Sequence, residues 1–427
     1  MKNLSVLIGE VEAGKYDELL LDIYEDEALI DYQKKRYVDL LKLYEKTYGT
    51  DDVEIYSAPG RSEVCGNHTD HQRGEVLATS INRDAIAVAA KNSDNVIRLV
   101  SGGYPMITVD LKDITKRKAD KGSSAGLIKG VVAGLLDAGY KAGGFNAYVT
   151  SDVIIGAGLS SSAAFETIIG TIISGLFNNM SISPVKIAQV GQYAENVYFG
   201  KPCGLMDQMA CSVGGLVHID FKDVNVPVVN KVKVDFSQHE HSLCIVDTKG
   251  SHTDLTDDYA AVPKEMRAVA GYFGKNVLRE VDEKQFYVNI ADIRKIVGDR
   301  AVLRAIHFFE EEKRVEKMVE CLNCGDFEGF LKVITNSDNS SFKYLQNVYT
   351  NKDVNNQGVS VGLAASEIAL AGKGATRVHG GGFAGTIQAF VPNEQVNDYK
   401  AFMDNVFGEG SCHVLKVRKY GGMKVIE

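Results

Sequence analysis

A run of small residues between an apolar strand and an apolar helix constrains the fold of this chain most. The segment NAYVTSDVII, residues 146–155, is strand-like, and the run GAGLSSSAA, residues 156–164, opens a helix that continues through Ile173. Glycines let backbone N–H groups approach an anion closely, and a helix N-terminus adds partial positive charge. The serine hydroxyls can bind phosphate oxygens or a hydrated Mg²⁺. The pattern favours a phosphate-binding loop, although a tight serine-capped turn would look similar.

The size and composition of the chain are typical of a two-domain globular protein. Its 427 residues exceed what one simple core holds, and 45% of them are hydrophobic. The net charge is −9 with scattered Lys and Arg, which disfavours a nucleic-acid partner. No apolar run reaches membrane-spanning length and no signal peptide is recognisable, so we expect a cytoplasmic protein with no membrane partner. Seven dispersed cysteines fit reduced thiols in that compartment.

Helical and strand-like patterns alternate along the chain as in an α+β protein. We expect further helices at residues 14–48, 184–199 and 292–336, and further strands at 53–58, 85–100 and 243–247. Pro59-Gly60 should end the first of these strands. Long charged helices dominate after about residue 220, so we expect one domain over residues 1–225 and a second over residues 226–427.

Four segments, in a fixed order, resemble motifs of the GHMP kinase superfamily. GAGLSSSAA at 156–164 resembles its nucleotide-binding motif, with Ile154 where a proline is usual. APGRSEVCGNHTD at 58–70 resembles the galactokinase signature APGRVNLIGEHTDY, and GKPCGLMDQ at 200–208 resembles GMPCGIMDQ. RVHGGGFAGT at 377–386 resembles the glycine-rich third motif of the family. On these motifs the chain is identified as a galactokinase-like member of the superfamily.

The resemblance implies a fold, a reaction and the molecules that take part. The fold would be the two-lobed α+β GHMP kinase fold, with an S5 domain 2-like N-terminal lobe and a ferredoxin-like C-terminal lobe. The reaction would be ATP-dependent transfer of the γ-phosphoryl group to the anomeric hydroxyl of galactose, with ATP and Mg²⁺ as cofactors. We expect a monomer or a weak dimer whose partner is a small sugar.

The same resemblance assigns roles to individual residues. Asp207 would orient the sugar hydroxyl or accept its proton, and Arg61 would stabilise negative charge beside it. The residues expected to contact the sugar are Arg61, Asn67, His68, Asp70, Gly204, Asp207 and Tyr259. The residues expected to bind ATP are Gly156, Gly158, Leu159, Ser160, Ser161, Ser162 and Ala163. The residues expected to bind Mg²⁺ are Ser161, Ser162 and Glu195.

Departures from the galactokinase signature leave alternative functions open. Asn67 stands where galactokinases have glutamate, and His71-Gln72 stands where they have Tyr-Asn. This variant is similar to plant galacturonokinases, whose substrate carries a carboxylate that Arg73 could neutralise, although a solvated Arg73 is also expected on a surface. Galactose is the expected substrate and galacturonate the alternative. A non-catalytic galactose or ATP sensor is the second alternative, which the retention of Arg61 and Asp207 disfavours.

Overall fold

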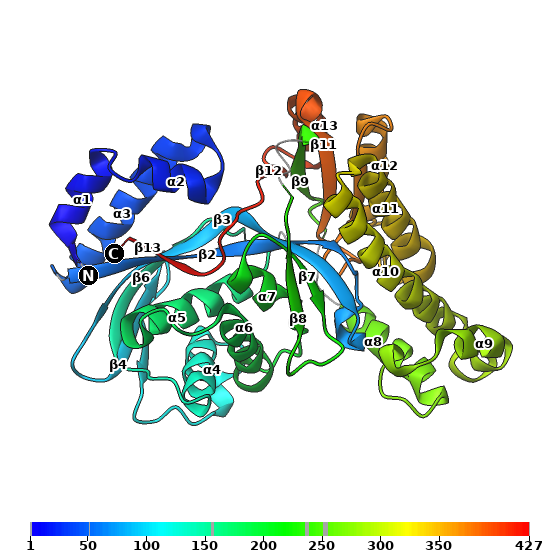
Figure 1. Cartoon of the computed structure of the whole chain (residues 1–427), viewed down its shortest axis with the longest axis horizontal. Helices are drawn as coiled ribbons and strands as arrows, with labels where there is room; N and C mark the ends of the chain where they lie inside the picture. Colours follow the sequence, from blue (N-terminus) through cyan, green and yellow to red (C-terminus); the bar gives the residue numbers. More distant parts are fainter. Residues whose placement is uncertain (1, 51, 155–157, 235–238, 251–254, 427) are drawn as a thin grey trace.

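The chain folds into two lobes, each built on a β-sheet with helices packed against it (Figure 1). The computed structural model describes residues 2–50, 52–154, 158–234, 239–250 and 255–426. The two-lobed α+β prediction is confirmed. Within the described residues, none of the helices combines the length and the apolar character that a membrane span requires.

The larger sheet forms the first lobe. Its strands are β1 (Lys2–Asn3), β2 (Asp52–Cys65), β3 (Glu75–Lys91), β4 (Val96–Ser101), β5 (Ile107–Asp110), β6 (Phe145–Ser151), β7 (Leu216–Asp220), β8 (Val228–Val232) and β13 (Met423–Ile426). Paired strands run antiparallel, except that β4 and β6 are parallel. The proposed domain boundary at residue 225 falls between β7 and β8. Because β13 pairs with β2, the last strand returns to the first lobe.

A break in register distinguishes β2 from the expected strand. The prediction that Pro59-Gly60 ends the strand is wrong, because β2 continues to Cys65. Its pairing with β3 shifts between Pro59 and Arg61, and this β-bulge accommodates the missing N–H of the proline. The N–H of Arg61 points away from the ladder and donates to the Leu159 carbonyl at 3.2 Å. The irregularity therefore ties β2 to the Gly/Ser-rich loop.

Helices cover both faces of the larger sheet (Figure 1). On one face lie α1 (Leu4–Glu12), α2 (Asp17–Tyr24) and α3 (Ile30–Tyr48), and on the other α4 (Ser124–Asp137), α5 (Ser161–Asn178), α6 (Pro184–Tyr193) and α7 (Met206–Val213). The prediction of one helix over 14–48 is wrong, because Glu25 adopts a φ of 55° and ends α2. The helix expected over 184–199 is confirmed as α6 followed by the π-helical turn Ala194–Phe199.

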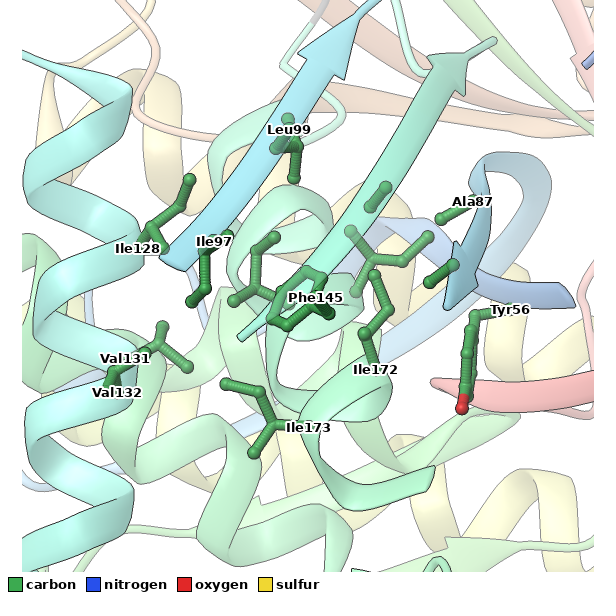
Figure 2. Packing of buried hydrophobic residues seen from close by; sticks show 14 of the residues in the cluster. Tyr56, Ala87, Ile97, Leu99, Ile128, Val131, Val132, Phe145, Ile172 and Ile173 are labelled. Carbon is green, nitrogen blue, oxygen red and sulfur yellow. The ribbon is translucent and has the colours of Figure 1, made fainter. Parts of the chain in front are cut away.

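Branched aliphatic side chains fill the space between this sheet and α4 and α5 (Figure 2). Leu99 of β4 and Phe145 of β6 pack with Val131 of α4 and Ile172 of α5, and all four are buried. Removing each such side chain from water stabilises the fold by about 1.5–3 kcal/mol. The core therefore holds α5 firmly, and the serine run lies at the N-terminal end of this helix.

The smaller sheet forms the second lobe. Its strands are β9 (His241–Asp247), β10 (Ala375–His379), β11 (Thr386–Pro392) and β12 (Cys412–Leu415), and its helices are α8 (Thr256–Tyr272), α9 (Glu283–Val297), α10 (Asp299–Cys324), α11 (Phe327–Ser340), α12 (Gly358–Leu370) and α13 (Val396–Phe407). The antiparallel strand order β10-β11-β9-β12, with helices after β9 and β11, is that of a split βαβ, ferredoxin-like lobe. The expected strand near 243–247 is confirmed. The helical stretch expected over 292–336 is also helical, with breaks at Gly298 and Gly325.

Candidate active site

The Gly/Ser-rich loop joins β6 to α5. Residues 155–157, including the predicted nucleotide ligand Gly156, lie outside the described residues. Gly158 has a φ of 65°, and a Cβ there would lie 2.8 Å from Thr386 Oγ1, so the position requires glycine. Ser160 precedes α5 without capping it through its side chain. The hydroxyl therefore does not compete with an anion for the first N–H groups of α5.

A cavity of about 290 Å³ lies between this loop and the second lobe. Loop residues 158–162 form one wall, and the glycine turn Gly380–Gly382 forms the facing wall. Ala163, which was also predicted to bind ATP, is buried behind the loop in the first turn of α5. The cavity is polar and lies at the small end of ligand sites, with room for a short chain of phosphate groups, so we call it the phosphate-sized cavity.

Arg61 of β2 and Asp207 in the first turn of α7 meet at this cavity. Arg61 Nε donates to Asp207 Oδ1 at 2.7 Å, and the Ser160 hydroxyl donates to Asp207 Oδ2. A second Arg61 nitrogen donates to the Gly158 carbonyl. Burial alone would raise the pKa of Asp207, but Arg61 and the Ser160 hydroxyl hold that pKa below its usual range. The predicted pair is therefore assembled, with Asp207 ionised at neutral pH.

Glu195 faces the start of α5 from the π-helical turn. The Ser162 hydroxyl donates to Glu195 Oε1 at 3.3 Å, and Lys201 Nζ donates to the same oxygen at 2.9 Å. Carboxylate and hydroxyl oxygens are the hard donors that Mg²⁺ prefers, and Ser161 lines the same cavity. Among the described residues there is no group of three or more His, Cys, Asp or Glu arranged for a metal. A Mg²⁺ ion here would need phosphate or water oxygens as further ligands.

Two buried residues near Glu195, Gln208 and Glu166, were missed from the sequence. Gln208 Nε2 donates to Glu195 Oε2 at 2.9 Å and to Glu166 Oε2 at 3.1 Å. Burial and the nearby charge of Glu195 raise the pKa of Glu166 to about 9, so Glu166 is neutral at pH 7. The available signal was spacing, because Glu166 lies four residues after Ser162 on one helix face and Gln208 follows Asp207 directly.

Asp70 and Gly204 lie together near Asp207, and His68 lies against the glycine turn. A Cβ on Gly204 would lie 1.7 Å from Asp70 Oδ2, so the absence of a side chain lets the carboxylate pack against the backbone. Burial, followed by the charge of Asp207, raises the pKa of Asp70 to about 7. His68 Nε2 lies 3.0 Å from the Gly381 carbonyl, and burial lowers the pKa of this imidazole. Of the three predicted sugar ligands, Asp70 and Gly204 are therefore brought into contact, whereas His68 contacts the glycine turn.

Asn67 and Tyr259 are directed mainly toward protein groups. Asn67 is 1% exposed, and its Nδ2 donates to Glu63 Oε1 at 2.9 Å and to the Gly380 carbonyl at 2.7 Å. Its Oδ1 accepts from Asn347 Nδ2 at 2.7 Å. Tyr259 packs on the glycine turn, and its hydroxyl donates to the Gly382 carbonyl at 2.9 Å. Their contacts with a sugar stay predictions.

Arg73 was considered as a counter-charge for a uronate. Its guanidinium donates to Glu280 Oε1 at 3.0 Å on the surface of the molecule. The alternative interpretation, a solvated surface arginine, agrees better with this position. The position of Arg73 therefore does not support galacturonate as the substrate.

A larger cavity, which the sequence did not reveal, adjoins the serine run. Its volume is about 1220 Å³, and it shares Ser161 and Ser162 with the phosphate-sized cavity. Apolar side chains dominate its walls, which include Tyr104–Ile107 before and within β5, Phe165 of α5 and Phe199. Such a space fits an aromatic base and its sugar beside a polyphosphate site. No single motif marks it, because separate elements supply the walls.

Comparisons with known proteins find similar sequences and folds. The model of the GHMP kinases N terminal domain matches residues 126–215, which contain the serine run and Asp207. The galactokinase galactose-binding signature matches residues 42–91, which contain Arg61 and Asp70. The galactokinase of Glaesserella parasuis is 29% identical over 83% of this chain and 89% of its own length. The galactokinase of Streptomyces coelicolor is 26% identical over 88% of this chain and 94% of its own length.

Solved structures agree on the fold. The galactokinase of Lactococcus lactis complexed with galactose has a TM-score of 0.78 and 23% identity, covering 91% of this chain and all of that chain. The mevalonate kinase of Methanococcus jannaschii has a TM-score of 0.60 and 16% identity, covering 85% of this chain and 98% of its own. The sequence motifs of this chain, the two matched family models and the shared fold make it similar to galactokinases and to other GHMP kinases over most of its length.

Proposed function

We propose that this protein is a sugar 1-kinase that transfers the γ-phosphoryl group of ATP to the anomeric hydroxyl of galactose. The observation that carries the proposal is the Arg61–Asp207 pair at the wall of the phosphate-sized cavity. Curated galactokinases align with most of the chain, which supports galactose as the acceptor. We place the reaction in the cytoplasm, where ATP is supplied.

The two adjoining cavities divide the nucleotide between them. The adenine and ribose would occupy the larger, mostly apolar cavity, and the phosphates would reach past Ser161 and Ser162 toward Asp207. The N-terminus of α5 then offers backbone N–H groups to the phosphates, and Gly158 lines the same cavity. The site therefore orients ATP with its terminal phosphate next to the catalytic pair.

Asp207 supplies the base or the electrostatic orientation for the acceptor. The anomeric oxygen would bond to the γ-phosphorus while the bond from phosphorus to the β–γ bridging oxygen breaks, releasing ADP. The hydroxyl proton passes to Asp207 or is oriented by it, and Arg61 stabilises negative charge on the transferring group. Mg²⁺, held through Glu195, Ser161 and Ser162, would neutralise charge on the phosphates.

The sugar would lie on the side of Asp207 that Asp70, His68 and Gly204 form. Asp70 and His68 carry groups that can bond to hydroxyls, and the bare backbone of Gly204 allows close approach. We retain Tyr259 and Asn67 as predicted contacts, with Asn67 acting mainly through the residues it positions.

A panel of sugars tests the proposal. Purified protein with MgATP should release ADP when galactose is present and form galactose 1-phosphate, while galacturonate and glucose should give at most a small fraction of that kcat/KM. If galacturonate is turned over in preference to galactose, galacturonate is the substrate and the proposal of galactose is wrong. Binding of galactose and ATP without turnover would instead support the sensor alternative.

A further inference from the structure

Lys201 is a cation at the phosphate-sized cavity to which no role has been given so far. It follows Gly200 in the loop between the π-helical turn and α7, at the position where the galactokinase segment GMPCGIMDQ carries an uncharged methionine. We infer that Lys201 binds the β- and γ-phosphates of the nucleotide and is a positioning residue for phosphoryl transfer. This inference rests on the proposed function for the identity of the ligand.

Two carboxylates near the cavity would repel the phosphates, so a cation such as Lys201 is needed to offset them. Asp207 and Glu195 bring carboxylates to the place where the anionic phosphates must lie. Among the described residues that line the cavity, the lysine and arginine side chains are those of Arg61 and Lys201. Arg61 is already bonded to Asp207 and to the Gly158 carbonyl. Lys201 is therefore the cation with capacity left for a phosphate.

The backbone of Lys201 is fixed while its side chain can turn. Its N–H donates to the Glu195 carbonyl at 3.1 Å, and Pro202 restricts the chain directly after it. The side chain is 61% exposed even though Nζ contacts Glu195 Oε1 at 2.9 Å. A flexible four-carbon stem with a point charge can exchange a carboxylate for a phosphate oxygen nearby without moving the backbone.

The ammonium group of Lys201 lies near two carboxylates. Nζ donates to Glu195 Oε1 at 2.9 Å, and Asp207 lines the same cavity as Lys201. Lys201 therefore borders the cavity together with the proposed base and contacts the expected metal ligand. A phosphate that enters the cavity meets the positive charges of both Arg61 and Lys201.

Calorimetric titration of nucleotides, with EDTA present and no sugar, tests this role. We expect K201M to weaken binding of ATP by about tenfold or more, because a charge-assisted contact is lost. Binding of AMP, which lacks the β- and γ-phosphates, should change by less than about twofold. K201R should retain most of the ATP affinity, because it keeps the charge.

Lys121 provides the matched control. Its stem lies beside Gly200, but it is exposed and does not line the cavity, so K121M removes a neighbouring positive charge from outside the site. Unchanged ATP affinity in K201M, or an equal loss in K121M, would overturn the inference. Because no sugar is present, these results do not depend on whether galactose is the acceptor. Melting temperatures confirm that each variant is folded.

Discussion

Removing the charge of Asp207 tests the proposed chemistry most directly. Asp207→Asn keeps the shape of the side chain and can still accept a hydrogen bond from Arg61. It removes the base and the negative charge, so we expect kcat to fall about a hundredfold or more. The KM for ATP should change little, because Asp207 is proposed to act on the sugar hydroxyl. Steady-state kinetics with galactose measure both, and a near-normal kcat would exclude Asp207 as the catalytic carboxylate.

The raised pKa of Asp70 predicts a pH dependence of sugar use. Burial and the charge of Asp207 raise this pKa to about 7, so Asp70 is mostly neutral at pH 6 and ionised at pH 8. The ionised carboxylate is the stronger acceptor for sugar hydroxyls, so kcat/KM for galactose should rise as pH increases through about 7. Asp70→Asn should show lower activity and a flat profile over this range. Identical profiles for the two proteins would assign the titration to another group.

The motif sequences predicted that Arg61 and Asp207 belong to one site, but not all of their surroundings. Arg61 and Asp207 were predicted because each lies in a segment whose residue order resembles that of a known family. The burial of Asn67 was not predictable, because it depends on Gly380 and Asn347, which lie hundreds of residues away in the chain. Local motifs record which groups are present, whereas contacts between lobes decide which of them face the cavity.

Asp84 of β3 joins elements that are distant in the sequence. Arg36 of α3 donates to Asp84 Oδ1 at 2.6 Å, and Arg418, which precedes β13, donates to Oδ2 at 2.8 Å. Asp84→Ala would leave these buried guanidinium groups without this counter-charge, so the free energy of unfolding should fall by about 3–5 kcal/mol. Denaturant unfolding measures the change. The exposed pair Asp94–Arg98 supplies the control D94A, and an equally small loss in both variants would contradict the prediction.

Local patterns predicted elements best where short-range forces decide them. The step from β6 into α5 was predicted because a strand, a glycine-rich turn and an apolar helix follow one another directly. β2 was predicted too short, because Pro59-Gly60 is a strand-ending signal by itself. Pairing with β3 on both sides of the bulge outweighs that signal. The outcome of that competition sets the position of Arg61, so the error concerned the site itself.

The contacts between the two lobes were the feature that the sequence predicted least. The two-lobed fold followed from the resemblance, but the larger cavity did not, because β5, α4, α5 and the segments near them build it together. The same holds for contacts between the lobes. Arg377 of β10 is fully buried and donates to Glu63 Oε1 of β2 at 2.8 Å. Glu63 also accepts from Asn67, so one carboxylate joins the segment expected to bind the sugar to the second lobe.

This junction changes how the departure at Asn67 should be tested. The galactokinase signature APGRVNLIGEHTDY has an amide and, four residues later, a carboxylate, whereas this chain has Glu63 and Asn67 in the reverse order. Asn67→Glu alone would set a buried carboxylate against Glu63 and the Gly380 carbonyl, which are both acceptors. We expect that single change to lower the free energy of unfolding by about 2 kcal/mol or more.

Exchanging both residues should recover part of the loss. In E63N/N67E an amide and a carboxylate again face each other, and the amide oxygen introduced at position 63 can accept from Arg377 where Glu63 did. A double-mutant cycle by denaturant unfolding, with E63N and N67E as the single variants, should give a favourable coupling of about 1 kcal/mol or more. Additive effects would mean that the two side chains do not act as a unit across the lobes. Galactose and galacturonate should be compared on E63N/N67E only if this double variant folds and shows the coupling. A change in kcat/KM would then reflect the moved charge rather than damage to the contacts between the lobes.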